Sequence, residues 1–270
     1  MTETGEQKTA LVTGASSGIG REIAELCARD GYDLILVARR EDRLRELQKT
    51  WTAQYSIEVR VVAMDLADGS APQKLFNELT GTSVDVLVNN AGFATYGPFA
   101  ESDVASQVEM VQVNVLTLTH LTRLFLPSMV RRGEGRILNL ASMAAFVPGP
   151  LMAIYYSTKA YVLSFSEALS EELRGSGVTV TAFCPGPTAT EFQARARLER
   201  SGLLRIAQAD VGPIAEAGYR AMMEGQAVAV PGTLNKIVTL LIRIAPRFLV
   251  RRVVKKLQSQ VRTPKTSKNP

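Results

Sequence analysis

The stretch KTALVTGASSGIGREIAELCARDG, residues 8–31, decides the fold. It begins with a continuous apolar run, which is typical of a strand that is buried on both faces. An amphipathic pattern then starts at Gly18 and predicts a helix that ends at Gly31. Between them, Gly14, Gly18 and Gly20 let the backbone bend sharply and approach a ligand closely. A strand, a glycine turn and a helix N-terminus in this order offer free N–H groups to a pyrophosphate, which favours a dinucleotide site over a plain tight turn.

Apolar runs alternate with helical patterns along the rest of the chain. Strands are predicted at residues 32–38, 57–65, 85–92, 135–142, 177–187 and 227–232, and helices at 41–55, 71–79, 101–132 and 151–174. This repeat implies parallel strands that are joined by right-handed crossovers. The sequence therefore predicts an α/β fold with a doubly wound parallel sheet, Rossmann-like, in a single domain over residues 1–233. Residues 234–270 are expected to form a basic, partly apolar C-terminal extension.

The composition is that of a soluble globular protein. Hydrophobic residues make up 46% of the 270 positions and charged residues 21%, which provides for a sizeable core. No run approaches the roughly 20 apolar residues of a membrane-spanning helix, and the first residues lack the apolar region of a signal peptide. Cys27 and Cys184 lie far apart in sequence and away from the single histidine, so neither a disulfide nor a metal site is expected. A reducing, cytoplasmic setting fits best.

The end of the second strand distinguishes between the two nicotinamide cofactors. An NAD site usually has an acidic residue there, which binds the ribose 2′-hydroxyl. This chain has Arg39 and Arg40 instead, and guanidinium groups suit a 2′-phosphate. NADP(H) is therefore the expected cofactor, although two arginines would also suit a solvated helix start. Asp65, at the end of the third strand, is placed either to contact the adenine ring or to cap the strand.

A set of motifs extends over residues 8–190. The glycine turn is followed by NNAG (89–92), the asparagine of VNV (113–115), the serine of NLAS (139–142), a Tyr-x-x-x-Lys pair and PGPTAT (185–190). In their order and spacing these motifs resemble the short-chain dehydrogenase/reductase family. The resemblance implies an oxidoreductase that transfers a hydride between NADP(H) and a carbonyl or secondary alcohol, without a metal. It also implies a homo-oligomer, because members of the family commonly form dimers or tetramers.

Two adjacent tyrosines precede the lysine of that pair. Tyr155 lies four residues before Lys159 and Tyr156 three, and both spacings bring side chains together on a helix. The resemblance selects Tyr155 as the catalytic acid or base and assigns Ser142 a hydrogen bond to the substrate oxygen. It further implies that Lys159 holds the nicotinamide ribose and that Asn114 holds a water linked to Lys159. The Lys159 ammonium is expected to lower the pKa of the phenol, while Tyr156 is expected to pack or to line the cleft.

The resemblance also assigns cofactor contacts to the turns that follow the strands. These are Gly14, Ser16, Ser17, Gly18, Ile19, Gly20, Arg39, Arg40, Asp65, Leu66, Asn90, Ala91, Gly92, Tyr155, Lys159, Pro185, Gly186, Thr188 and Thr190. Taken singly, a serine at a strand end or a lysine on a helix is ordinary. The prediction depends on their joint presence in the right order.

Substrate choice in such folds comes from the loops beyond the strands. Apolar residues in these loops predict a pocket for a hydrophobic carbonyl or alcohol: Phe93, Met143, Phe146, Met152 and Pro187. The segment 191–209 carries four arginines and is expected to be either a mobile lid or a solvated helix. His120 falls inside a predicted helix, outside every motif, and is expected to be an ordinary helix residue.

The end of the chain is strongly basic. After Glu224 there are ten Lys and Arg residues and no acidic residue, so the rest of the chain is net acidic although the whole carries +5. Residues 234–257 mix these cations with aliphatic side chains. Such a segment either lies on an anionic membrane surface or forms helices that pack on the domain or on a partner subunit. A nucleic-acid role would need more than a cationic stretch.

These observations leave a leading function and two alternatives. The leading one is an NADP(H)-dependent carbonyl reductase or alcohol dehydrogenase that acts on an apolar small molecule in the cytoplasm. A 3-oxoacyl-thioester reductase of lipid metabolism is the second, because an apolar cleft and a cationic tail would suit an acyl carrier. A non-catalytic NADP-sensing regulatory protein on the same fold is the third, and the presence of all four catalytic residues argues against it.

Overall fold

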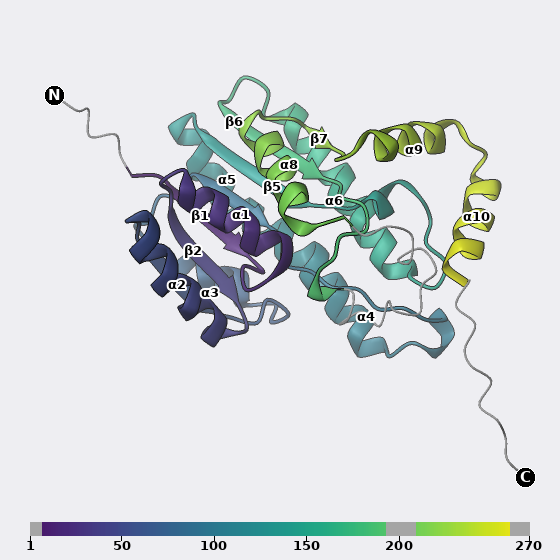
Figure 1. The fold of residues 1–270 in the computed structure, drawn as a ribbon, viewed down its shortest axis with the longest axis horizontal. Coiled ribbons are helices and arrows are strands. Elements are labelled where there is room, and N and C mark those ends of the chain that lie inside the picture. Colours follow the sequence, from purple (N-terminus) through teal and green to yellow (C-terminus); the bar gives the residue numbers. More distant parts are fainter. Residues whose placement is uncertain (1–6, 193–208, 260–270) are drawn as a thin grey trace, which may run out of the picture.

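The computed structural model describes residues 7–192 and 209–259 of the chain. Within these residues the strands form one parallel sheet in the order β3-β2-β1-β4-β5-β6-β7 (Figure 1). The strands are β1 (Thr9–Thr13), β2 (Asp33–Ala38), β3 (Val59–Ala63), β4 (Val86–Asn89), β5 (Gly135–Leu140), β6 (Val178–Phe183) and β7 (Val228–Ala229). The predicted doubly wound α/β fold is therefore confirmed.

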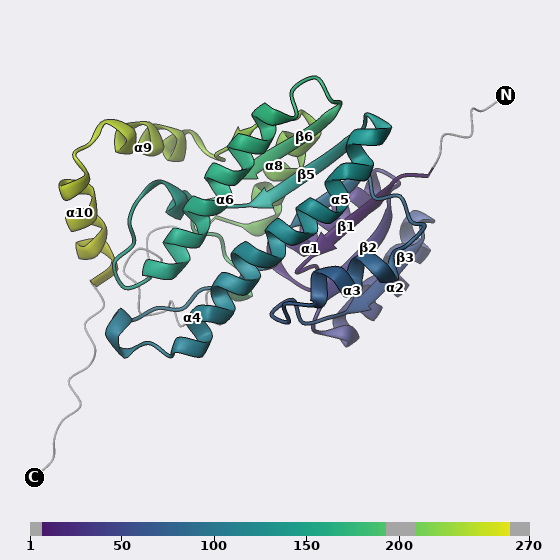
Figure 2. The same cartoon turned by 180° about the vertical axis from the view of Figure 1, so that it is seen from behind.

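Helices cover both faces of the sheet (Figures 1 and 2). One face carries α1 (Gly18–Arg29), α2 (Glu41–Tyr55) and α8 (Val211–Met223), and the other carries α3 (Ala71–Glu78), α5 (Leu118–Arg132) and α6 (Ala153–Glu172). In β1, Ala10 and Val12 belong to the core under α1, while Leu11 between them belongs to the core under α5. Because strand side chains alternate between the two faces, a strand that is covered on both faces is apolar throughout.

The sheet order reverses between β1 and β4, and the loops that follow these two strands are joined there. The Asn90 side-chain amide donates to the carbonyls of Thr13 at 2.9 Å and Gly14 at 3.2 Å. In return, the backbone N–H groups of Asn90 and Ala91 donate to the Thr13 hydroxyl at 3.0 and 3.1 Å. Ligands of open α/β sheets bind at such a reversal, outside the carboxyl ends of the strands. The Thr13–Asn90 bonds therefore hold the two loops of the expected cofactor site in one arrangement.

The long helix predicted over residues 101–132 is in fact interrupted. A short 3₁₀ turn, η1 (Phe99–Glu101), is followed by α4 (Val104–Val111), a π-helical turn η2 (Gln112–Thr117) and α5. The Asp103 carboxylate caps α4 by accepting from the Ser106 N–H at 2.8 Å. Single π turns inside helices occur frequently at functional sites, and this one contains Asn114. Several predicted strands were also too long, because their last residues belong to the loops that form the site.

The C-terminal segment forms α9 (Thr233–Ile244) and α10 (Arg247–Ser259), which follow the edge strand β7. Figure 1 shows α9 leading away from the sheet and α10 turning back alongside the loop that precedes α4. This return is fixed by the Tyr96 hydroxyl, which donates to the Gln258 carbonyl at 2.8 Å. No helix in the described part of the chain is long and apolar enough to cross a membrane.

Candidate active site

A cavity of about 840 Å³ lies at the carboxyl ends of the strands. Its wall starts at the glycine turn after β1, continues along the loops after β2, β3 and β4, and reaches α6. The far end of the wall is formed by the inner sides of α9 and α10. The cavity therefore connects the expected cofactor site with a second region that the C-terminal helices enclose.

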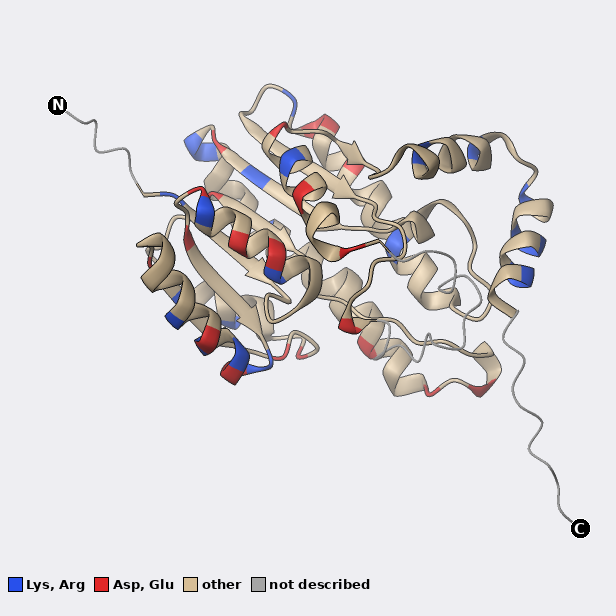
Figure 3. Ribbon diagram, viewed as in Figure 1, with Lys and Arg blue, Asp and Glu red and all other residues tan. Residues whose placement is uncertain are grey.

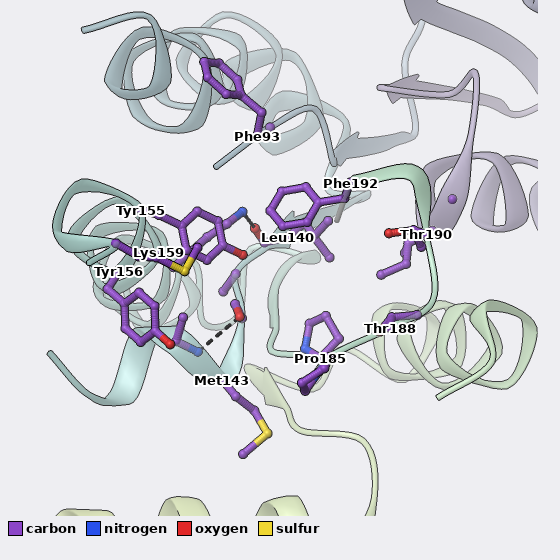
Figure 4. Close-up of a pocket in the computed structure, with 18 of the residues that line it drawn as sticks. Phe93, Leu140, Met143, Tyr155, Tyr156, Lys159, Pro185, Thr188, Thr190 and Phe192 are labelled. Atoms are coloured by element: carbon purple, nitrogen blue, oxygen red, sulfur yellow. Dashed lines mark hydrogen bonds between the residues drawn. The ribbon is translucent and has the colours of Figure 1, made fainter. Parts of the chain in front are cut away.

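Tyr155 and Lys159 lie side by side on α6, next to the cavity (Figure 4). Lys159 is 5% exposed, and its Nζ donates a hydrogen bond of 2.5 Å to the carbonyl of Leu140, the last residue of β5. The same Nζ is 5.8 Å from the centroid of the Tyr155 ring. The Ser142 hydroxyl lies near the phenol and lowers its pKa, and its Oγ accepts a hydrogen bond from the Ala144 N–H at 3.1 Å. Three of the four predicted catalytic side chains thus meet at one point of the wall.

Burial is the main cause of the pKa shifts of Tyr155 and Lys159. It raises the pKa of the Tyr155 phenol, and the Ser142 hydrogen bond opposes it only partly. The pKa of Tyr155 is therefore raised and not lowered as predicted, because the loss of water dominates and Lys159 does not offset it. Burial also lowers the pKa of Lys159 to about 8. At neutral pH the phenol keeps its proton, which is the state that a proton donor needs.

Asn114 is close to this group but lies behind the cavity wall. It is 1% exposed, and its amide donates to the Phe93 carbonyl at 3.0 Å and to the Thr158 hydroxyl at 3.1 Å. Its Oδ1 accepts from the Phe93 N–H at 3.1 Å. The side chain therefore ties the loop after β4 to α6 and positions both. The predicted water relay stays a prediction.

Tyr156 points to a different part of the wall from Tyr155. Its ring meets that of Tyr155 edge-on, with the centroids 6.0 Å apart. Its hydroxyl accepts a hydrogen bond from Gln258 Nε2 on α10 at 2.8 Å. Tyr156 thus packs against the Tyr155 ring and lines the cavity, as the sequence predicted.

Nearly all predicted cofactor contacts line the cavity. They are Gly14, Ser16, Ser17, Gly18, Ile19, Arg39, Arg40, Asp65, Leu66, Asn90, Ala91, Gly92, Tyr155, Lys159, Pro185, Gly186, Thr188 and Thr190. Gly20 is the exception, because it is buried against the loop after β4. A Cβ at Gly20 would lie 2.2 Å from Asn90 Nδ2, so this glycine serves close packing of the turn rather than contact with a ligand.

The chemistry of the wall fits a phosphorylated dinucleotide. Gly14 and Gly18 have φ values of +66° and +59°, a conformation that glycine adopts without strain. Arg40 donates to the Ser16 and Ser17 hydroxyls at 3.0 and 2.8 Å, so a guanidinium lies directly at the glycine turn. Such a cofactor would be held by the turn and the arginines at one end and by Lys159 at the other.

The substrate side differs from the prediction at one residue. Phe93, Met143, Met152 and Pro187 line the cavity. Phe146 does not, because the 3₁₀ turn η3 (Met143–Phe146) directs it into a core cluster with Leu118, Val162 and Leu163. His120 lies on α5 away from the cavity, in agreement with its predicted role as a helix residue.

Several residues of the wall were not predicted. Phe192 faces Tyr155 across the cavity, with the ring centroids 5.6 Å apart (Figure 4). The largest unpredicted group comes from the C-terminal helices: Val238, Ile242, Ala245, Leu249, Val250, Val253, Val254, Leu257 and Gln258. The sequence showed that aliphatic residues recur along these helices. It did not show that the helices cover this side of the domain. Most of the predicted lid or helix at 191–209 lies outside the described residues.

Comparison with known proteins identifies the family. The family model described as short chain dehydrogenase matches residues 8–201. The chain belongs to the short-chain dehydrogenase family. Very-long-chain 3-oxoacyl-CoA reductase from Rattus norvegicus is 36% identical to this family member over 187 residues, which are 68% of the present chain and 60% of the rat protein. The human protein of the same name matches to the same extent.

Solved structures of family members superpose over almost the whole chain. A short-chain dehydrogenase from Sphingobium yanoikuyae in complex with NADPH has 30% identity and a TM-score of 0.80, with 96% of this chain and 99% of that chain covered. The bulky-bulky ketone specific alcohol dehydrogenase from Comamonas testosteroni has 27% identity and a TM-score of 0.77, with 98% and 100% covered. The α9–α10 segment is therefore within the region that these dehydrogenases share.

The position of the two tyrosines predicts different effects of their substitution. Tyr155→Phe removes the phenol next to Ser142 and Lys159, so carbonyl reduction should fall by about 10²-fold or more, the usual contribution of a proton donor. The dissociation constant of NADPH should stay within about twofold, as fluorescence titration would measure. Tyr156→Phe keeps the catalytic phenol and should retain most of the activity; a Tyr155→Phe enzyme with full turnover would contradict this assignment.

The lowered pKa of Lys159 predicts a pH dependence. The ammonium is present below about pH 8 and is lost as the pH rises through that value. If the charge is needed beside Tyr155, kcat/KM for reduction should be level below pH 8 and fall about tenfold per unit above it. Initial rates between pH 6 and 10 measure this, with circular dichroism as a check that the fold persists. A level profile up to pH 10 would exclude a catalytic charge on Lys159.

Proposed function

We propose that this dehydrogenase reduces the 3-oxo group of a long-chain acyl thioester and uses NADPH as the hydride donor. The observation that carries the proposal is the apolar far end of the cavity, next to Tyr155. The names of the rat and human relatives agree with this substrate class. The chain spans about 60% of the length of these relatives, so we propose their activity for this chain and do not infer it from the match alone.

The far end of the cavity suits a hydrocarbon chain. Two helices contribute aliphatic side chains to it and few polar ones: Val238, Ile242, Leu249, Val250, Val253, Val254 and Leu257. Burying hydrocarbon against such a wall contributes about 0.8 kcal/mol per CH₂. Phe93 and Met152 extend the apolar surface towards the catalytic group. A substrate with a reactive carbonyl and a long apolar tail would use both regions.

The catalytic side chains then have defined tasks. When bound, NADPH supplies a hydride to the carbonyl carbon. The neutral Tyr155 phenol gives its proton to the carbonyl oxygen. The Ser142 hydroxyl accepts from the Ala144 N–H and donates its own hydrogen to that oxygen. Lys159, held by the Leu140 carbonyl, stabilises the phenolate that remains after the proton has left.

The preference for NADPH over NADH rests on the arginines at the glycine turn. Arg39 and Arg40 line the cavity where the adenosine end of a dinucleotide would lie. No acidic residue follows β2 directly; Asp65, in the loop after β3, is 3.9 Å from Arg39. The Sphingobium protein, at 30% identity, was solved with NADPH, which supports the same choice.

A second candidate is the reduction of a bulky ketone without a thioester. The Comamonas enzyme is specific for bulky ketones by its name and covers all but 2% of this chain. The same apolar cavity would accept such a substrate. The NADP-sensing alternative is disfavoured, because Ser142, Tyr155 and Lys159 are assembled around one point.

We propose a cytoplasmic location with peripheral contact to an anionic membrane surface. The outer sides of α9 and α10 are exposed and apolar: Leu234, Ile237, Leu240, Leu241, Ile244 and Phe248. Beside them lie Lys236, Arg243, Arg247, Arg251, Arg252, Lys255 and Lys256, and neither helix has an acidic residue (Figure 3). An anionic bilayer matches both the apolar and the cationic component.

A second copy of the chain is a poorer match for this surface. Two such copies would bring cations against cations, and like charges across an interface are unfavourable. Homo-oligomer formation through another surface stays a prediction from the family. The free, buried thiols of Cys27 and Cys184 agree with a reducing location.

The proposed substrate predicts a dependence on chain length. With NADPH and 3-oxoacyl thioesters of 4 to 16 carbons, kcat/KM should rise by up to about fourfold per added CH₂, since ~0.8 kcal/mol is gained for each. Ile242→Asp, which places a charge in the cavity wall, should abolish this rise. Leu240→Asp is the matched control, because Leu240 is on the same helix but outside the cavity.

The outcome separates the two candidate functions. A bulky aromatic ketone should be a weaker substrate than the longest thioester. Equal rates for all chain lengths, together with a high rate for the ketone, would overturn the thioester proposal and favour the second candidate.

The proposed membrane contact predicts charge-dependent binding. Full-length protein should sediment with vesicles that contain phosphatidylglycerol and not with pure phosphatidylcholine. Arg251→Gln with Arg252→Gln should weaken binding by about 25-fold, at ~1 kcal/mol for each cation near the surface. Val130→Glu on α5 is the control for an exposed apolar residue elsewhere. Wild-type protein that remains in the supernatant with both kinds of vesicle would refute the contact.

A further inference from the structure

A carboxylate lies among the arginines at the cofactor end of the cavity. Glu191 Oε2 is 2.6 Å from Arg40 NH1, and Glu191 Oε1 is 2.6 Å from Arg43 NH1. Both carboxylate oxygens are therefore engaged, each by a different guanidinium. Glu191 and Arg40 line the same cavity, so this pair is part of the site and not a remote surface contact.

Through its bond to Arg40, Glu191 occupies the place where the 2′-phosphate of NADP(H) is predicted to bind. The same guanidinium donates from NH2 to the hydroxyls of Ser16 and Ser17, which belong to the glycine turn. The Arg40 guanidinium thus lies between the Glu191 carboxylate and the glycine turn. The sequence predicts that a 2′-phosphate binds to this guanidinium. Among the described residues, the ion pair of Arg39 is a long 3.9 Å contact with Asp65, in contrast to the two short pairs of Glu191.

Glu191 carries its charge throughout the neutral range. Hydrogen bonds from Arg43 and Arg40 lower the pKa of its carboxyl to about 2. The side chain is 53% exposed, so the pairs are accessible to water and to an incoming ligand. Surface ion pairs of this kind are weak and are readily exchanged for a stronger partner.

We infer that Glu191 is an internal anion that the adenosine 2′-phosphate of NADP(H) displaces from Arg40 and Arg43. A phosphate monoester brings up to two charges and three acceptor oxygens, so the exchange favours the phosphate over a carboxylate. A ribose 2′-hydroxyl has no charge and leaves the pairs intact. Glu191 consequently lowers the affinity for NADP(H) and favours its release, while it leaves the affinity for NAD(H) unchanged.

The test uses cofactor fragments and the full chain, so its result is independent of the substrate proposal. Dissociation constants of 2′,5′-ADP and 5′-AMP are measured by isothermal titration calorimetry for the wild type and Glu191→Gln. The variant should bind 2′,5′-ADP about three- to fivefold more tightly at low ionic strength, the range of an exposed ion pair, and bind 5′-AMP as the wild type does. The difference should shrink in 0.5 M salt, where such pairs are screened.

Glu41→Gln is the matched control. Glu41 is 2.6 Å from Arg45 on α2 but does not line the cavity, so its loss should change neither dissociation constant. Weaker or unchanged binding of 2′,5′-ADP by Glu191→Gln would overturn the inference, because the carboxylate would then merely orient the arginines or play no part. Circular dichroism of both variants excludes a loss of fold as the cause of weaker binding.

Discussion

A buried ammonium beside a buried phenol is the constraint on which the site depends. The bond from Lys159 to the Leu140 carbonyl joins α6 to the end of β5, and it thereby sets Tyr155 against Ser142. Removing a cation and a phenol from water costs free energy, so neither group would hold this place without the packed sheet and helices around it. The cost appears as two opposite pKa shifts, with the tyrosine raised and the lysine lowered. The fold thus keeps the Tyr155 phenol protonated at neutral pH, so that it can donate its proton to a carbonyl oxygen.

The sequence was sufficient to predict the parallel sheet and most residues of the cavity wall. Parallel strands end at the same edge of the sheet, and the motifs follow the ends of these strands. What it could not provide depends on contacts between distant residues. The break of the long helix at Asn114 is set by its bonds to Phe93 and Thr158, 21 and 44 residues away. The direction of Phe146 depends on the turn after β5. The sign of the Tyr155 shift was missed because a neighbouring charge is visible in a sequence, whereas the degree of burial is not.

The C-terminal helices illustrate another limit of pattern reading. The sequence left open whether these helices pack on the domain or a partner subunit, or lie on a membrane. The two possibilities were treated as alternatives. In the structure both helices are apolar on two sides: Ile242 and Val254 line the cavity, while Ile237 on α9 and Phe248 on α10 are exposed. The described helices also carry no negative charge. The residues of α9 and α10 therefore line one end of the cavity and also expose several large apolar side chains.

Gln258 joins these two roles. Its carbonyl accepts from Tyr96 and its amide donates to Tyr156, the residue next to Tyr155. Movement of α10 away from the body of the protein must break both bonds, and a ligand that spreads the far end of the cavity strains the same bonds from inside. A displacement of α10 would therefore be felt at Tyr156, beside Tyr155, because Gln258 ties the outermost helix to the helix that carries both tyrosines.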